Sequence, residues 1–208
     1  FVSQKKFSKA IKTLSKGDIK KDKHSKVLYF MEMGRLYYGK GDYSYAADWF
    51  NKAKKLIDDY YTKSIGQKVA SKAMNENLEN YYGEVFEVSI LHYYLAKSYY
   101  NIYLTGKISE VKLTTVKGKT TKKRVIKILG KNKSKQYLYS ARAEILAWDS
   151  FYKDVQRSGN KTIFKSDLLV KLFGATLHEA IGSRSDLNTA LQLYQDAKKV
   201  LYTVSNIL

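Results

Sequence analysis

The side chains that most often carry catalysis are few in this sequence and widely spaced. His24, His92 and His178 lie on separate segments and show neither an H-E-x-x-H pattern nor another paired-ligand spacing. Glu84 and Glu87 lie one helical turn apart and could share a cation, but two isolated carboxylates make a weak site. His92 stands beside tyrosines on a predicted helix, where we expect a hydrogen-bonded packing residue.

The sequence also lacks the residues and motifs of other common catalytic sites. The 208 residues include no cysteine, which excludes thiolate metal sites, iron–sulfur clusters and cysteine nucleophiles. No G-x-S-x-G, P-loop or glycine-rich dinucleotide pattern occurs. We therefore expect a protein that is not an enzyme, with no catalytic residue, no metal and no cofactor.

Positive charge is the strongest chemical signal. Lys and Arg number 38 against 19 Asp and Glu, a formal net charge of +19. Between Lys107 and Lys135 lie eleven basic residues and one acid, so this segment holds more than half of the excess. Such a segment attracts phosphate-rich or carboxylate-rich surfaces, with an affinity that falls steeply with salt. The alternative is a surface that only keeps the protein soluble. The candidate contact residues are Lys117, Lys119, Lys122, Lys123, Arg124 and Lys127.

Charge alone does not indicate nucleic-acid binding. The sequence contains no RNP-type aromatic strand, zinc finger or recognition-helix signature, and arginine is scarce beside lysine. The sequence therefore does not favour a nucleic-acid partner. It also has no run of about 18 consecutive apolar residues, so it predicts no membrane-spanning helix.

The elements that must position these residues are predicted to be helices. Residues 27–39 and 43–57 carry apolar residues at three- and four-residue spacing, and Gly41 lies in a turn between them. This unit resembles the tetratricopeptide repeat (TPR), in which small residues let two helices approach closely and aromatic residues fill the gaps. The residues that match its pattern are Phe30, Met33, Gly34, Tyr37, Gly41, Tyr43, Ala46, Phe50 and Ala53.

Weaker copies of the pattern follow along the chain. We therefore predict one all-α domain over residues 1–208, a TPR-like superhelix (an α-solenoid) of antiparallel helix hairpins. The predicted parts are a half repeat at 1–16, a repeat at 27–60, an additional helix at 62–78, a repeat at 87–157 and a repeat at 164–205.

Residues 106–135 interrupt the repeat at 87–157 and differ in composition. Residues 108–116 and 121–129 are rich in β-branched side chains, and Lys117-Gly118-Lys119 lies between them. This pattern predicts a basic β-hairpin inserted between two helices. The alternative is a solvated, mobile loop.

In TPR arrays the first helix of each repeat lines a concave face. The concave face forms a groove. The resemblance implies that the positions of this chain that point into the groove hold basic, amide and tyrosine side chains. These would suit an acidic peptide or a C-terminal carboxylate. For any one residue the alternative is ordinary helix packing, because tyrosine occurs 19 times. The candidate groove residues are Arg35, Tyr38, Tyr93, Lys97, Tyr100, Asn101, Lys171 and His178.

A second resemblance covers residues 27–148. The Asn75-Glu-Asn77 segment, the Tyr81-Tyr-Gly83-Glu84 step and the His92-Tyr-Tyr-Leu-Ala96 helix are similar to those of a family of uncharacterised bacterial TPR-like lipoproteins. The resemblance implies the periplasmic side of a bacterial cell envelope, with membrane attachment only through a lipid anchor upstream. It brings no assigned activity, and composition alone fits the cytoplasm equally well. The resemblance also indicates a secondary loop site at Asn75, Asn77, Tyr82 and Gly83. The alternative is that these residues cap helices, since asparagine and glycine are common capping residues.

Two functions follow from these patterns. The first is a protein–protein interaction or scaffold module that binds an acidic or C-terminal peptide segment in the concave groove. The second is a polyanion-binding protein that contacts anionic lipid, envelope polymer or nucleic acid through the basic hairpin. Deleting the hairpin separates them, because only the second function should then be lost.

Overall fold

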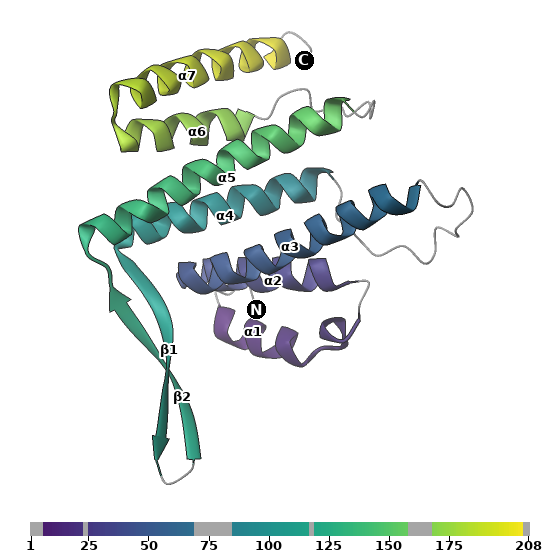
Figure 1. Ribbon diagram of the computed structural model, residues 1–208, viewed down its shortest axis with the longest axis vertical. Helices are drawn as coiled ribbons and strands as arrows, with labels where there is room; N and C mark the ends of the chain where they lie inside the picture. The colour runs from purple at the N-terminus through teal and green to yellow at the C-terminus, as the bar shows by residue number, and fades with distance from the viewer. Residues whose placement is uncertain (1–5, 23–24, 69–84, 117–118, 158–167, 206–208) are drawn as a thin grey trace.

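The computed structural model describes residues 6–22, 25–68, 85–116, 119–157 and 168–205 (Figure 1). These ranges are mostly helical, with one two-stranded antiparallel sheet, so the prediction of a mainly helical protein with a single β-hairpin is confirmed. None of the described helices combines the length and apolar composition that a membrane crossing requires. The elements are α1 (Phe7–Lys16), the 3-10 helix η1 (Asp18–Lys20), α2 (Lys26–Gly39), α3 (Tyr43–Lys68), α4 (Val85–Thr105), β1 (Lys107–Val116), β2 (Lys119–Ile128), α5 (Lys131–Arg157), α6 (Leu168–Ile181) and α7 (Arg184–Ser205).

Helices α2 and α3 form the hairpin that the sequence predicts at residues 27–57. Gly41 closes the end of α2 with a positive φ of 81°, and its N–H donates to the carbonyl of Tyr38 at 2.9 Å. Between the helices, a Cβ placed on Gly34 would lie 2.6 Å from the ring of the fully buried Phe50. Because no larger side chain fits there, the glycine permits the close approach of the two helices.

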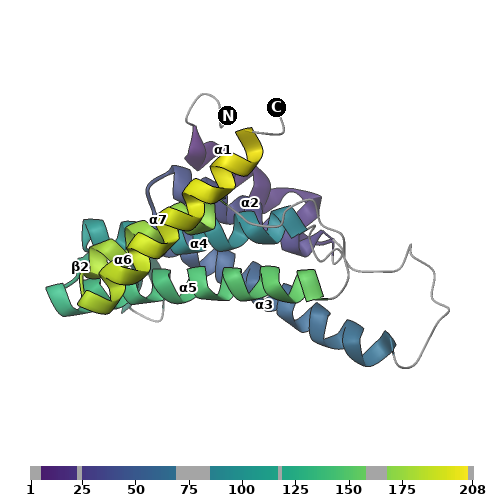
Figure 2. The same ribbon diagram turned by 90° about the horizontal axis from the view of Figure 1, so that it is seen from above.

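Two further hairpins follow. Helices α4 and α5 pack against each other and are joined through β1 and β2, while α6 and α7 meet at a tight turn at Gly182. The hairpins lie side by side in sequence order, α3 against α4 and α5 against α6 (Figure 1). Viewed from above, α2 and α4 lie in one layer and α3 and α5 in another (Figure 2). The first helix of the second hairpin, α4, also contacts the first helices of the other two hairpins, α2 and α6, so one face of the molecule draws residues from all three hairpins.

Two apolar clusters hold these layers together, and α4 contributes to both. The first cluster joins α2, α3 and α4 around Phe50 and Leu95. The second joins α4, α5 and α6 around Leu138, Trp148 and Leu177. All five side chains are almost completely buried, so α4 is the element that fixes one half of the helical body relative to the other.

Two predicted boundaries are wrong. Helix α3 continues without a break to Lys68, so residues 62–68 extend it instead of starting an additional helix, and residues 69–78 lie outside the described ranges. No glycine or proline between residues 43 and 65 could have ended the helix. Helix α5 begins at Lys131, so residues 131–135 belong to a helix and not to the inserted hairpin.

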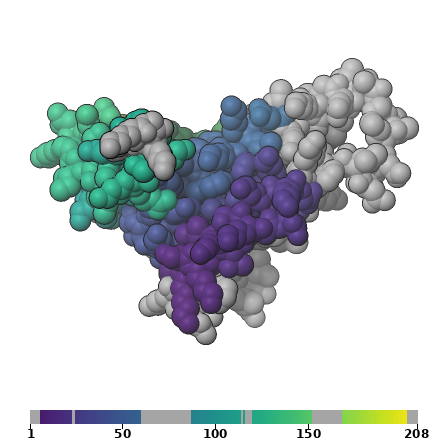
Figure 3. Space-filling view, turned by 90° about the horizontal axis from the view of Figure 1, so that it is seen from below, coloured from purple at the N-terminus to yellow at the C-terminus, as the bar shows by residue number. Residues whose placement is uncertain are grey.

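The hairpin itself lies close to its predicted position. The predicted strands at 108–116 and 121–129 are observed at 107–116 and 119–128, paired in register from Lys107–Ile128 to Val116–Lys119. Figure 1 shows the hairpin extending away from the helices, and Figure 3, seen from below, shows its teal atoms to one side of the purple N-terminal helices.

Candidate functional site

Five of the eight predicted groove residues lie together on the face formed by the first helices. Tyr38 comes from α2, while Tyr93, Lys97, Tyr100 and Asn101 come from α4. Asn101 Nδ2 donates to the hydroxyl of Tyr38 at 2.9 Å, and Lys97 Nζ donates to the hydroxyl of Tyr93 at 2.9 Å. We call these five residues the Lys97 face.

Helix α6 completes the surroundings of this face through Phe173. Its ring meets Tyr93 at a centroid distance of 5.9 Å and Tyr100 at 5.8 Å, both close to edge-on. Edge-to-face contacts of this kind hold aromatic rings in fixed orientations. The tyrosines of the Lys97 face are therefore positioned by packing and not only by their hydrogen bonds.

Lys97 supplies the positive charge of this face. Its Nζ also lies 5.1 Å from the centroid of the Tyr93 ring. The hydrogen bond to Tyr93 raises the pKa of Lys97 and outweighs the opposing effect of burial, so the side chain is charged at neutral pH. Within the described ranges, no carboxylate lies at ion-pair distance from Lys97.

The other half-buried cations of the described ranges, and the more exposed Arg124, have carboxylate partners. The pairs are Lys54 with Glu144 at 2.9 Å, Arg124 with Asp42 at 2.9 Å, Arg142 with Asp186 at 3.0 Å, and Lys171 with Asp196 at 3.9 Å. Lys97 differs from them because its described partners are neutral hydroxyls and aromatic rings.

The tyrosine hydroxyls near Lys97 can still donate hydrogen bonds to a ligand. The hydroxyls of Tyr38 and Tyr93 each accept one hydrogen bond, and neither has an acceptor for its own hydrogen within the described part of the chain. Burial raises the pKa of Tyr38, so its hydroxyl keeps that hydrogen at neutral pH. An ammonium group and two hydroxyl hydrogens can therefore be offered to an acceptor, and a carboxylate is the acceptor that best suits them.

Three predicted groove residues do not join the Lys97 face. Arg35 is exposed and pairs with Glu32 on its own helix at 3.0 Å. Lys171 points toward Asp196 of α7. His178 is 9% exposed, and its groove assignment is wrong because the two-residue turn between α6 and α7 places a carboxylate directly against it.

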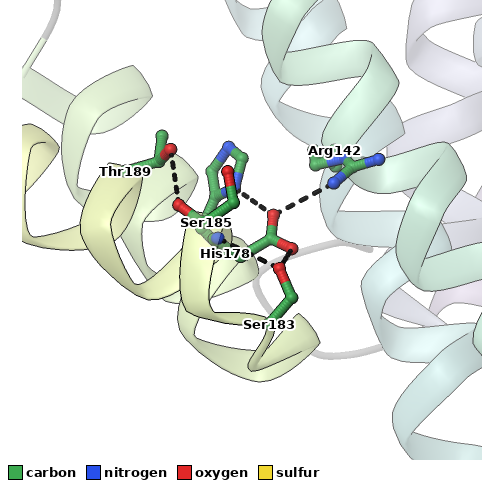
Figure 4. A network of polar contacts seen from close by, with 6 residues as sticks. Arg142, His178, Ser183, Ser185 and Thr189 are labelled. Carbon is green, nitrogen blue, oxygen red and sulfur yellow. Dashed lines mark hydrogen bonds and ion pairs between the residues drawn. The ribbon is translucent and has the colours of Figure 1, made fainter.

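That carboxylate belongs to Asp186, which joins three helices (Figure 4). Asp186 Oδ1 lies 2.7 Å from His178 Nδ1 and accepts from Arg142 Nη1 of α5 at 3.0 Å. Ser183 Oγ donates to the other carboxylate oxygen and accepts from the Asp186 N–H, which caps α7. The hydrogen bond from Ser183, helped by those from His178 and Arg142 and opposed by burial, lowers the pKa of Asp186. This network satisfies its own charges and serves the fold.

A second buried network lies around Glu144 on α5. His92 Nδ1 is 2.5 Å from Glu144 Oε1, and Lys54 Nζ of α3 donates to both carboxylate oxygens at 2.9 Å. Burial would raise the pKa of Glu144, but the hydrogen bonds and charges of His92 and Lys54 outweigh it and lower the pKa. The prediction that His92 is a hydrogen-bonded packing residue is confirmed.

Arg124 holds the hairpin against the helical body. Its guanidinium lies 3.9 Å from the centroid of the Tyr45 ring and donates to Asp42 Oδ2 at 2.9 Å. At the base of β1, the N–H of Ser109 donates to Ser44 Oγ at 2.8 Å. Arg124 therefore serves as an anchor, whereas the sequence grouped it with the contact residues.

The lysines predicted as contact residues of the hairpin differ in their surroundings. Lys122 and Lys123 are exposed, and Lys127 forms an ion pair with the single acid of the segment at 2.8 Å. Lys117 lies outside the described residues, and of Lys119 only the backbone is described. The secondary loop site at Asn75, Asn77, Tyr82 and Gly83 also lies outside them, as does His24.

Sequence reasoning missed Glu144, Asp186 and Lys54. Glu144 is 52 residues from His92 and 90 from Lys54, so no local spacing could reveal that network. Asp186 did leave a signal, because Ser183-Arg-Ser-Asp186 has the spacing of a helix N-terminal capping box. Across the described ranges, no group of three or more histidine and acidic side chains could hold a metal ion.

No protein-family model matches the chain, and neither a curated protein nor a solved structure does. The TPR and lipoprotein resemblances therefore stay predictions from the residues.

Proposed function

We propose that this protein is a non-enzymatic interaction module whose Lys97 face binds a carboxylate of a partner polypeptide, in an acidic segment or at a C terminus. The observation that carries the proposal is the ammonium group of Lys97, which is charged and half-buried and meets only neutral partners among the described residues. A carboxylate there would accept charge-assisted hydrogen bonds from Lys97 and the neighbouring tyrosine hydroxyls.

The surroundings of Lys97 suit a peptide better than a free ion. Tyr38, Tyr93 and Tyr100 offer broad, partly apolar contact area on rings whose orientations are already fixed by packing. Preordered tyrosines lose little conformational entropy on binding, so contact with a peptide backbone and its side chains adds to the affinity.

The proposal includes a TPR-like superhelix with this face as its concave side. The supporting observations are the close approach at Gly34 and the contacts of α4 with both α2 and α6. Small-angle X-ray scattering tests the shape: an elongated, curved particle is expected, and a spherical profile would contradict the superhelix. The envelope location implied by the resemblance belongs to the same proposal.

The test compares a short neutral peptide that ends in a free carboxylate with the same peptide as its C-terminal amide, by fluorescence anisotropy. Lys97→Met should weaken carboxylate binding by about tenfold or more, because a hydrogen bond to a charged group is lost. Lys55→Met, at an exposed lysine of α3, changes the net charge equally and should leave binding intact. Equal losses in both variants would overturn the site, as would equal binding of acid and amide.

The polyanion interpretation makes the opposite prediction about the hairpin. Residues 107–128 can be replaced by a short glycine linker, because the Leu129 N–H already donates to the Gly106 carbonyl at 2.7 Å. We expect this deletion to keep the binding of the C-terminal carboxylate peptide. Loss of that binding together with the hairpin would move the function to the basic insertion.

A further inference from the structure

The two strands of the hairpin have different surroundings. The backbone of β1 is tied to α3 by the hydrogen bond from Ser109 to Ser44, and β1 packs against α3 and α4. Strand β2 reaches the body through the side chain of Arg124. The outer edge of β2 is therefore the longer stretch of strand edge that a further chain could approach.

The register identifies the backbone groups on that edge. Leu129 N–H donates to the Gly106 carbonyl, so this pair is hydrogen-bonded and the following pairs alternate from it. Ser109 and Ile126 then form a non-hydrogen-bonded pair, in agreement with the outward N–H of Ser109. The N–H and C=O groups of the even-numbered residues 120–128 consequently point away from β1. Among the described residues these groups have no backbone partner.

The two faces of the hairpin carry different side chains. One face carries four exposed apolar side chains together with the basic residues Lys107, Lys122 and Arg124. Its exposed apolar side chains are Val111 (49% exposed), Leu113 (63%), Ile126 (71%) and Ile128 (76%). The opposite face carries Lys112 and Lys123, which stand directly across from each other.

This arrangement of charge selects against some partners. Two lysines directly opposite each other repel, so the Lys112–Lys123 pair costs the hairpin stability. A second copy of the chain would bring the same lysines to the edge and add to the repulsion, since lysines on an edge strand are a common protection against self-pairing. An acidic segment would relieve the repulsion.

We propose that the outer edge of β2 binds an extended acidic segment of a partner protein as a third strand of this sheet. The side chains of the bound segment alternate: apolar residues lie beside Ile126 and Ile128, and acidic residues lie on the opposite face, beside Lys123. Backbone hydrogen bonds supply affinity and the alternation supplies specificity. The contacts of Arg124 with Tyr45 and Asp42 hold the hairpin in place before binding, which lowers the entropic cost of binding the segment. This site is independent of the Lys97 face.

The first test measures the binding of a strand-length peptide of alternating glutamate and valine to the full chain by fluorescence anisotropy. Two comparison peptides keep its composition: one collects the residues into a glutamate block and a valine block, and one carries N-methyl groups along one edge. We expect both to bind about tenfold more weakly, since strand addition needs both the alternation and the backbone donors. Equal affinity of all three would overturn the proposal.

Matched variants then locate the binding edge. Ile126→Pro and Val111→Pro each remove one outward N–H, from β2 and from β1 respectively, and both spare the hydrogen bonds between the strands. Lys123→Glu and Lys112→Glu make the same change of charge on the two strands. We expect the β2 variants to weaken binding of the alternating peptide several-fold more than their β1 counterparts. Equal effects, or larger effects on β1, would overturn the assignment.

Two further probes distinguish strand addition from binding at the Lys97 face and from simple attraction of charge. In Lys97→Met the preference for the alternating peptide over the block and N-methylated peptides should persist, because a carboxylate site at the Lys97 face does not distinguish the alternation or the backbone donors of the three peptides. Loss of that preference in Lys97→Met would place the binding at the Lys97 face and overturn the proposal. Single-stranded oligonucleotides and vesicles of anionic lipid test a surface that recognises charge alone. If these bind as tightly as the peptide and respond equally to Lys123→Glu and Lys112→Glu, the hairpin is a general polyanion surface and the strand-addition proposal fails.

Discussion

Lys54 and Lys97 are half-buried lysines on the neighbouring helices α3 and α4, yet they meet different partners. Lys54 donates to both oxygens of Glu144, a buried carboxylate that also contacts His92. Lys97 meets the hydroxyl and ring of Tyr93. A lysine whose charge is neutralised within the fold contributes to stability, whereas a lysine left with neutral partners retains the capacity to bind an anion. The four predictions below test this division of roles.

The largest effect is expected where the ion pair is most buried. Glu144→Gln removes the carboxylate that Lys54 and His92 share, and should reduce the free energy of unfolding by about 3 kcal/mol, because it leaves a charge without its partner. Urea unfolding followed by circular dichroism measures this change. A loss below about 0.5 kcal/mol, the size typical of surface substitutions, would contradict the structural role of the network.

A similar but smaller loss is expected at the second network. Asp186→Asn keeps the shape of the side chain but removes the charge that faces Arg142 and His178, and should cost about 2 kcal/mol. The same unfolding measurement applies. Binding of a carboxylate peptide at the Lys97 face should persist in the folded variant, and its loss would show that the two regions are coupled.

The pH dependence of stability follows from both carboxylates. The pKa of Glu144 and that of Asp186 lie below their ordinary values of 4.5 and 3.8, so the folded state binds fewer protons than the unfolded state in acid. Their stabilising effect is complete above the ordinary values and is lost as the pH falls through the lower folded pKa values. Urea unfolding between pH 7 and pH 3 should show this loss, with a flatter profile in Glu144→Gln. An identical profile in the variant would contradict the assignment.

The smallest effect on stability is expected at Lys97. Lys97→Met loses only a hydrogen bond to a neutral hydroxyl and keeps the apolar stem, so the free energy of unfolding should change by about 0.5 kcal/mol or less. Lys54→Met, the matched change in the other lysine, should cost clearly more because it leaves Glu144 short of a partner. Equal losses in the two variants would remove the distinction between them.

The parts of the fold that the sequence predicted are those set by local spacing. The hairpin of α2 and α3 follows from apolar periodicity, the turn at Gly41 and the small residue Gly34, all within one short stretch. The β-hairpin likewise follows from two β-branched runs on either side of the sequence Lys117-Gly118-Lys119. Local signals of this kind need no knowledge of tertiary contacts.

The candidate site was less predictable because its roles depend on distant partners. His178 and Lys97 look alike in the sequence as basic residues on the first helix of a pair. His178 Nδ1 lies within hydrogen-bond distance of Asp186 Oδ1 across a tight turn, whereas no described carboxylate reaches Lys97. Arg124 could not be told from its lysine neighbours until the hairpin was placed beside Tyr45 and Asp42.

The most direct test of the central claim follows the side chain of Lys97 itself. Isotope-labelled lysine allows its Cε resonance to be recorded by NMR during titration with a peptide that ends in a free carboxylate, and again with the corresponding amide. We predict that the Lys97 resonance shifts with the carboxylate peptide and stays in place with the amide, while that of Lys54 responds to neither. If the hairpin lysines shift and Lys97 does not, the Lys97 face is not the binding site.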